Sequence, residues 1–128
     1  ALLEASEAAG VTEEVLKASD TVGNTALIQA SRQGREACVR ALLEASERAG
    51  VTEEALRDGK ALRDASAGGH EGCVRALLEA SERAGVTMDV LTAKDGRGRT
   101  ALHLADANGR EACVRVLRDA SERARRGV

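Results

Sequence analysis

The cysteines are the first residues whose chemistry must be considered, because a thiolate can act as a nucleophile or bind a metal. The chain has three of them, Cys38, Cys73 and Cys113, and each directly precedes a Val-Arg dipeptide. A structural zinc site needs Cys or His ligands in close pairs, and no such pair accompanies any of the three. We therefore expect no metal ion and no cofactor at these positions.

The two histidines do not predict catalysis either. His103 lies three residues before Asp106, and His70 directly precedes Glu71. A catalytic histidine needs a group that orients it and a nucleophile or substrate within reach, and the sequence supplies no convergent set of this kind. We expect that the protein is not an enzyme and has no catalytic residues.

The segment Asp95-Gly96-Arg97-Gly98 could suggest a loop that binds a cation or a phosphate. A calcium loop needs several oxygen ligands at set spacing. This segment and the Arg99 that follows it offer one carboxylate and two arginines. A turn is therefore the better interpretation.

Six arginines recur in two ladders, and a basic stripe of this kind could bind phosphates. Each of them follows an acidic residue by four positions, a spacing that puts opposite charges side by side on a helix. These pairs should neutralise most of the stripe. The chain has a net charge of −2 and no aromatic residue to stack on bases, so we expect no nucleic-acid partner. The arginines and their acids are Arg40 (Glu36), Arg75 (Glu71), Arg115 (Glu111), Arg48 (Glu44), Arg83 (Glu79) and Arg123 (Asp119).

An internal repeat supplies the elements that position these residues. The sequence ALLEASEAAGVTEEVL at residues 1–16 returns almost unchanged at residues 41–56 and 76–91, and a diverged copy closes the chain at residues 116–128. Self-similarity at a fixed period indicates a solenoid, a class of protein that usually binds a partner rather than transforming a substrate. Because Phe, Trp, Tyr and Pro are absent, the core must be built from Ala, Leu, Val and Cys.

One unit reads as helix, turn, helix and a loop with a short helical segment. Thr100 is a suitable N-cap for a first short helix, which the Asn108-Gly109 dipeptide ends. A second helix is predicted from about Glu111 to Arg123, and in the equivalent loop of an earlier unit Thr52 can cap a third segment. In a stack of such units, equivalent helices lie about 8–10 Å apart, which is too far for a disulfide. The cysteines should then form a ladder of buried free thiols.

Free structural thiols favour a reducing compartment, so we expect a cytoplasmic or otherwise intracellular protein. No apolar run approaches the roughly twenty residues that a membrane-spanning helix needs. We therefore expect no membrane partner.

The residues of the last complete unit carry a known pattern. They run Thr100-Ala101-Leu102-His103-Leu104-Ala105, then Gly109, then Cys113-Val114-Arg115-Val116-Leu117. This unit resembles the ankyrin repeat, whose signature is T-P-L-H-x-A with a later Gly and a Val-Val-x-Leu-Leu run. An earlier unit matches in the same way through Thr25-Ala26-Leu27, Gly34 and Cys38–Leu43. The resemblance implies an all-α repeat solenoid, an ankyrin-like stack of helix–turn–helix units with short or truncated β-hairpin fingers. It also implies structural roles for His103 and His70.

The sequence departs from the family pattern in its motif and in its length. Ala26, Ala61 and Ala101 stand where the family has Pro, and only His103 keeps the motif's His. The units are about 40 residues long rather than the family's 33, so we expect elongated second helices.

The middle unit departs most from the pattern, because it is five residues short between Leu56 and Leu62. The missing residues fall where an ankyrin repeat projects its finger, and the capping Thr is replaced by Lys60. We expect a truncated finger at Arg57–Lys60 and a weakly capped helix around Ala61–Ala67.

These boundaries divide a single repeat domain of residues 1–128 into units at 1–20, 21–59, 60–94 and 95–128. The first is a partial unit with an outer helix only, so we expect that end either to continue into an upstream repeat or to associate with a second chain. At the other end Arg118 replaces Leu43 and Leu78, as expected for a polar cap.

The resemblance implies a protein–protein interaction module that binds a partner protein through the concave face of its inner helices and fingers. The alternative is a structural spacer, or an engineered or duplicated scaffold without a dedicated ligand, which would explain the near-identical copies. The candidate contact residues are the finger and inner-helix positions that packing does not require: Thr21, Asn24, Ile28, Gln29, Arg32, Gln33, Lys60, Arg63, Asp64, Arg97, Arg99, Leu104, Asp106 and Asn108.

Overall fold

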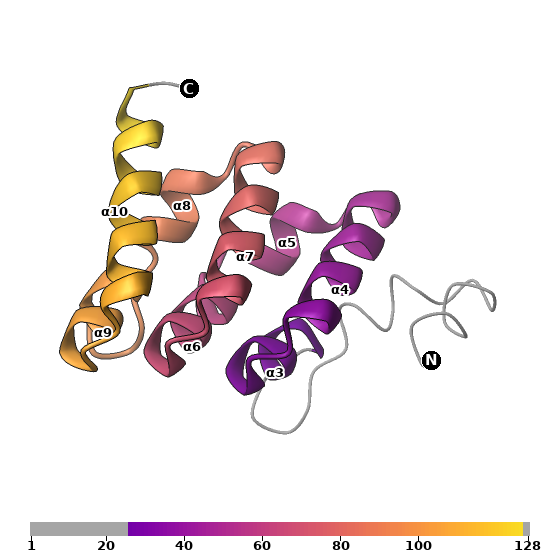
Figure 1. Ribbon diagram of the computed structural model, residues 1–128. Coiled ribbons are helices and arrows are strands. Elements are labelled where there is room, and N and C mark those ends of the chain that lie inside the picture. Colours follow the sequence, from indigo (N-terminus) through magenta and orange to yellow (C-terminus); the bar gives the residue numbers. More distant parts are fainter. Residues whose placement is uncertain (1–25, 127–128) are drawn as a thin grey trace.

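The computed structural model describes residues 26–126, and every regular element within that range is an α-helix. The helices stack side by side, and no strand lies between them among these residues (Figure 1). This confirms the all-α repeat solenoid predicted from the sequence. The helices are α3 (Ala26–Gln33), α4 (Glu36–Ala49), α5 (Thr52–Leu56), α6 (Lys60–Gly68), α7 (Glu71–Ala84), α8 (Thr87–Thr92), α9 (Ala101–Ala107) and α10 (Glu111–Arg125).

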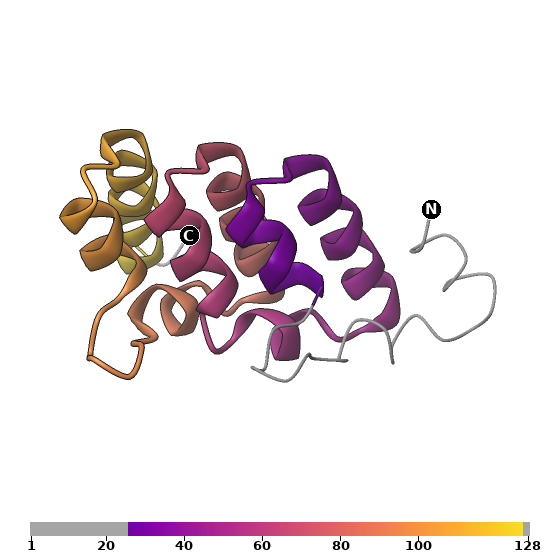
Figure 2. The same cartoon turned by 90° about the horizontal axis from the view of Figure 1, so that it is seen from below.

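The helices form two rows, with a short third helix connecting successive pairs. We call α3, α6 and α9 the inner helices and α4, α7 and α10 the outer helices; α6 packs between α3 and α9, and α7 between α4 and α10 (Figures 1 and 2). The short helix α5 packs on α7, and α8 packs on α10. Each short helix therefore lies on the outer helix of the unit that follows it, so adjacent units share one core.

The chain leaves the outer helices α4 and α7 at glycines in the left-handed conformation. Gly50 and Gly85 both have φ of 74°, which L side chains rarely adopt. After Gly50, the Val51 N–H donates to the Ser46 carbonyl at 3.0 Å, so the turn satisfies a carbonyl at the helix end. Val51 is also the N-cap of α5, which makes the predicted Thr52 cap wrong by one residue.

The core consists of aliphatic side chains and small residues where the helices meet. Val39, Val74 and Leu77 are fully buried at 0% exposure. At the C-terminal end, Arg118 is exposed, whereas Leu43 and Leu78, at the equivalent positions of α4 and α7, are each 2% exposed. This agrees with the polar position predicted for Arg118. The continuous core cluster runs from α3 to α10, so no unit closes a core of its own.

The predicted ladder of three buried thiols is wrong at its first member. Cys73 and Cys113 are buried at 1% and 0% exposure, and burial raises the pKa of both thiols. Cys38 is exposed. Cys73 lies on the side of α7 that faces α4, near Glu36 and Arg40, whereas no outer helix precedes α4 within residues 26–126.

The shortened finger becomes a tight corner that ends at Gly59. Its φ of 71° places it in the left-handed region, and no side-chain hydrogen bond caps α6 from this position, as predicted. Two other hydrogen bonds stabilise this corner. The Asp58 carboxylate accepts the Lys60 N–H at 3.0 Å, and Arg63 Nη1 donates to the Asp58 carbonyl at 2.7 Å. The corner also packs closely on the next connection, because a Cβ at Gly59 would lie 2.8 Å from the Ala93 Cβ.

No helix among the described residues is both long and apolar enough to cross a membrane.

Replacing Gly59 by alanine should destabilise the stack more than the same change at Gly85. Both glycines have positive φ, which costs an L residue about 1–2 kcal/mol. At Gly85 no atom lies within 4 Å of the added Cβ, whereas at Gly59 the Cβ meets Ala93 and the Val90 carbonyl. The collision should add about 1–3 kcal/mol. Urea unfolding of the two variants measures the difference, and equal losses of stability would contradict the close packing of this corner.

Candidate functional site

Most of the candidate contact residues are accessible along the inner helices and the turn before α9. Ile28 and Arg63 are the exceptions, at 4% and 9% exposure, and Asn24 and Thr21 lie outside the described residues. The exposed candidates are Gln29, Arg32, Gln33, Arg97, Arg99, Asp106 and Asn108, and the half-buried ones are Lys60, Asp64 and Leu104.

Ile28 and Arg63 occupy equivalent positions in α3 and α6, and both are corrections to the predicted contact set. Ile28 belongs to the continuous core, as expected of a large aliphatic side chain between stacked helices. The Arg63 guanidinium folds back onto the truncated finger to reach the Asp58 carbonyl, which leaves it 9% exposed. His103 takes the same position in α9 and is exposed.

Two adjacent inner helices are linked by opposite charges. Arg32 Nη2 on α3 lies 3.5 Å from Asp64 Oδ2 on α6, and the Asp64 side chain is 26% exposed. An acid–base pair therefore links α3 and α6 in the inner row.

A hydrogen bond between neighbouring units recurs at the turns between inner and outer helices. The sequence did not predict its partners. His70 Nε2 lies 3.1 Å from the Arg32 carbonyl, and Arg110 Nε donates to the Ala67 carbonyl at 3.1 Å. Since a carbonyl only accepts, His70 must carry its proton on Nε2. Each residue precedes an outer helix and binds a carbonyl near the end of the preceding unit's inner helix, where carbonyls lack intrahelical partners. His70 is therefore structural, as expected.

The expected turn at residues 95–99 is present and is organised by one carboxylate. Asp95 Oδ1 accepts the N–H groups of Arg97 and Arg99 at 2.8 and 2.9 Å, and Asp95 Oδ2 accepts Arg99 Nε at 2.9 Å. The backbone N–H of Arg99 is the largest cause that lowers the pKa of Asp95. Desolvation opposes it, and the Arg97 N–H and the Arg99 guanidinium lower the pKa further. The turn holds the Arg99 side chain against Asp95 and presents an exposed Arg97.

The helix that follows this turn begins with a reciprocal cap. Thr100 Oγ1 accepts the His103 N–H at 3.3 Å, and His103 Nδ1 accepts the Thr100 N–H at 3.2 Å. Thr100 is thus the predicted N-cap, and His103 has the structural role that the resemblance implied.

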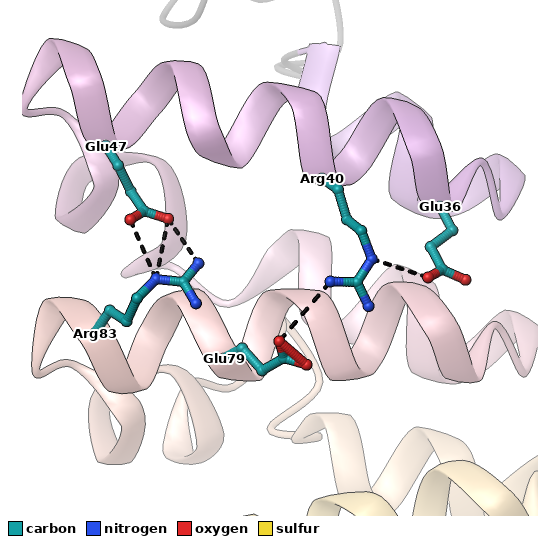
Figure 3. Close-up of polar contacts among 5 residues, drawn as sticks. All are labelled: Glu36, Arg40, Glu47, Glu79 and Arg83. Atoms are coloured by element: carbon teal, nitrogen blue, oxygen red, sulfur yellow. Dashed lines mark hydrogen bonds and ion pairs between the residues drawn. The ribbon is translucent and has the colours of Figure 1, made fainter.

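Several charges on the outer helices form ion pairs, and some of these pairs join two helices (Figure 3). Arg40 binds Glu36 at 2.9 Å, and Arg75 binds Glu71 at 2.6 Å, as the spacing of four predicts. The predicted partners of Arg83 and Arg123 are wrong. These two bind glutamates on the preceding outer helix, and each distance is 2.7 Å: Arg83 with Glu47 and Arg123 with Glu82.

This arrangement follows from the register of the stack. Equal repeats place the glutamate of one outer helix beside the arginine of the next, and the Arg83 contact lowers the pKa of Glu47. Glu79, the predicted partner of Arg83, lies instead 3.8 Å from Arg40 on α4 (Figure 3). Exposed pairs of this kind contribute little to stability, because solvent screens the charges.

Within residues 26–126, no group of three or more His, Cys, Asp or Glu side chains is placed to hold a metal ion. Some polar residues of the inner row and the turn before α9 take part in a cap, a turn or an ion pair, as Thr100, Asp95 and Arg32 do.

The hydrogen bonds in this turn should lower the pKa of Asp95. Its pKa should lie below the ordinary value of about 3.9, and Arg99→Ala should raise it only in part, because the two backbone N–H groups remain. Arg97→Ala, which removes no side-chain contact to Asp95, should leave the pKa unchanged. Carboxyl chemical shifts followed against pH measure all three values. A full return to the ordinary pKa in Arg99→Ala would show that the guanidinium, not the backbone, holds the carboxylate.

The comparison with known families matches this geometry. The ankyrin repeat family model matches residues 22–53 and 97–125, and no curated protein matches the chain. One matched segment includes α3 and α4, and the other includes the end of the turn, α9 and all of α10. The unit with the truncated finger lies between them. Ankyrin repeats are generally protein–protein interaction modules and are typically non-catalytic. The two matched segments are ankyrin repeats, and the stack of helices to which they belong has the architecture of that family.

Proposed function

We propose that the protein binds a partner protein through the inner helices and the turn before α9, and that it performs no catalysis. The main support for this proposal is that the units differ at exposed positions of the inner helices. The outer-helix sequence ALLEASERAGVT is repeated at residues 41–52 and 76–87, whereas exposed inner-helix positions change from unit to unit. Gln33 on α3, for example, corresponds to Gly68 on α6 and Asn108 after α9.

The chemistry of this surface favours polar recognition. Arginine is the one residue type of the usual interface hot spots that the chain contains, since it has no Trp or Tyr. Arg32 lies near Asp64 and Arg99 lies against Asp95, so each guanidinium already has an acidic neighbour before a partner arrives. Preorganised side chains lose less entropy on binding. We infer a partner that offers carbonyls and carboxylates to the inner row and binds with modest affinity.

A spacer without a dedicated ligand is the second candidate, because the outer helices of successive units are near-identical copies. The two candidates predict different effects of substitution. If the protein is a spacer, replacing exposed inner-row residues should weaken no interaction with a partner.

A matched pair of surface variants tests the proposal. The inner-row variant combines Gln33→Ala, Arg97→Ala and Asn108→Ala, and the outer-row control combines Glu44→Ala and Asp119→Ala, which are exposed at equivalent outer positions. A partner captured by cross-linking from cells of the source organism is purified and titrated against each variant. The inner-row variant should lose about tenfold or more in affinity, equivalent to about 1.4 kcal/mol, and the control should bind as the parent does. The reverse order of effects would move the site to the outer row, and no change in either variant would favour the spacer.

A further inference from the structure

One side of α4 exposes residues whose equivalents are buried in the other outer helices. Cys38 is exposed and Ala41 is half-buried, and both lie on this side of α4. Their equivalents Cys73 and Ala76 on α7 are 1% and 2% exposed. On α10 the equivalent Cys113 is 0% exposed. The difference arises because α7 and α10 each have a preceding outer helix packed on this side, whereas no outer helix precedes α4 within the described range.

In two places the structure shows which segment packs against the equivalent side of an outer helix. Residues 41–56, which form the second half of α4 and then α5, pack on α7, and residues 76–91 pack on α10 through α7 and α8. Each covering segment provides a buried leucine, Leu43 or Leu78, at 2% exposure. Each also provides a glutamate that reaches an arginine on the covered helix, as Glu47 reaches Arg83 (Figure 3).

The same chain carries this covering sequence a further time, at residues 1–16. We propose that residues 1–16 dock on the exposed side of α4 as residues 41–56 dock on α7. Leu3 stands at the position of Leu43, and Glu7 at the position of Glu47. Arg48 stands at the position of Arg83, so Glu7 and Arg48 are the charges that this docking brings together. The occupant is thus a segment of the same chain, attached through residues 17–25.

The reactivity of Cys38 reports on this docking. A covered thiol is alkylated only when its cover opens, so Cys38 in the full chain should react at least about tenfold more slowly than in the variant Leu3→Asp. Iodoacetamide labelling with peptide-level mass spectrometry resolves Cys38 from Cys73 and Cys113, which remain slow in both proteins if the stack is intact. Ala8→Arg is the matched control, because Arg83, at the equivalent position, points to the preceding unit and not to the following one.

A charge exchange provides an independent variant that does not place a charge in an apolar contact. Glu7→Arg should speed the labelling of Cys38 by up to about fivefold, the loss of one exposed ion pair, and Arg48→Glu in the same chain should restore the slow rate. Failure of the second change to restore it would overturn the predicted pairing.

The remaining outcomes decide the occupant. Slow labelling that is independent of protein concentration, in a chain that light scattering shows to be a monomer, supports docking within the chain. Slow labelling that appears only in a dimer would overturn it in favour of the segment of a second copy. Fast labelling of Cys38 in the full chain, with Cys73 and Cys113 still slow, would overturn the docking altogether.

Discussion

The contact between neighbouring units is the interaction on which the rest of this structure depends. Without aromatic side chains, each unit has too little apolar area to close a core alone, and the core runs without a break from α3 to α10. Small residues at the contacts allow the helices to approach closely. The cost of this design is that positions such as Gly59 tolerate no added methyl group, because the next connection already occupies the space.

The same constraint explains why the polar contacts repeat. His70 and Arg110 each reach a carbonyl in the preceding unit, and Glu47 and Glu82 each reach an arginine in the following one. Individually these contacts are weak, since most are exposed. Their geometry nevertheless fixes one register of the stack, because a slip between units would separate every pair at once.

Local sequence rules predicted the elements well and the contacts between them poorly. The Thr100 cap and the pairing of Arg40 with Glu36 depend on neighbours along the chain, so spacing alone was sufficient. For Arg83, the spacing of four predicts a partner on its own helix, whereas the structure pairs it with Glu47 on α4. Spacing along one helix contains no information about the residues of the adjacent helix. The burial of Arg63 depends on the corner that the missing finger residues create, and the exposure of Cys38 depends on which helix precedes α4. Both are properties of the assembled stack.

Hydrogen exchange on a variant of the middle outer helix tests most directly whether the units share one core. Leu77 is 0% exposed, and Leu77→Ala should cost about 2–5 kcal/mol. If the stack is stabilised through its interfaces, amide protection should fall in α3, α4, α9 and α10 as well as in α6, α7 and α8. Loss of protection confined to α6–α8, with the flanking helices unchanged, would contradict this account.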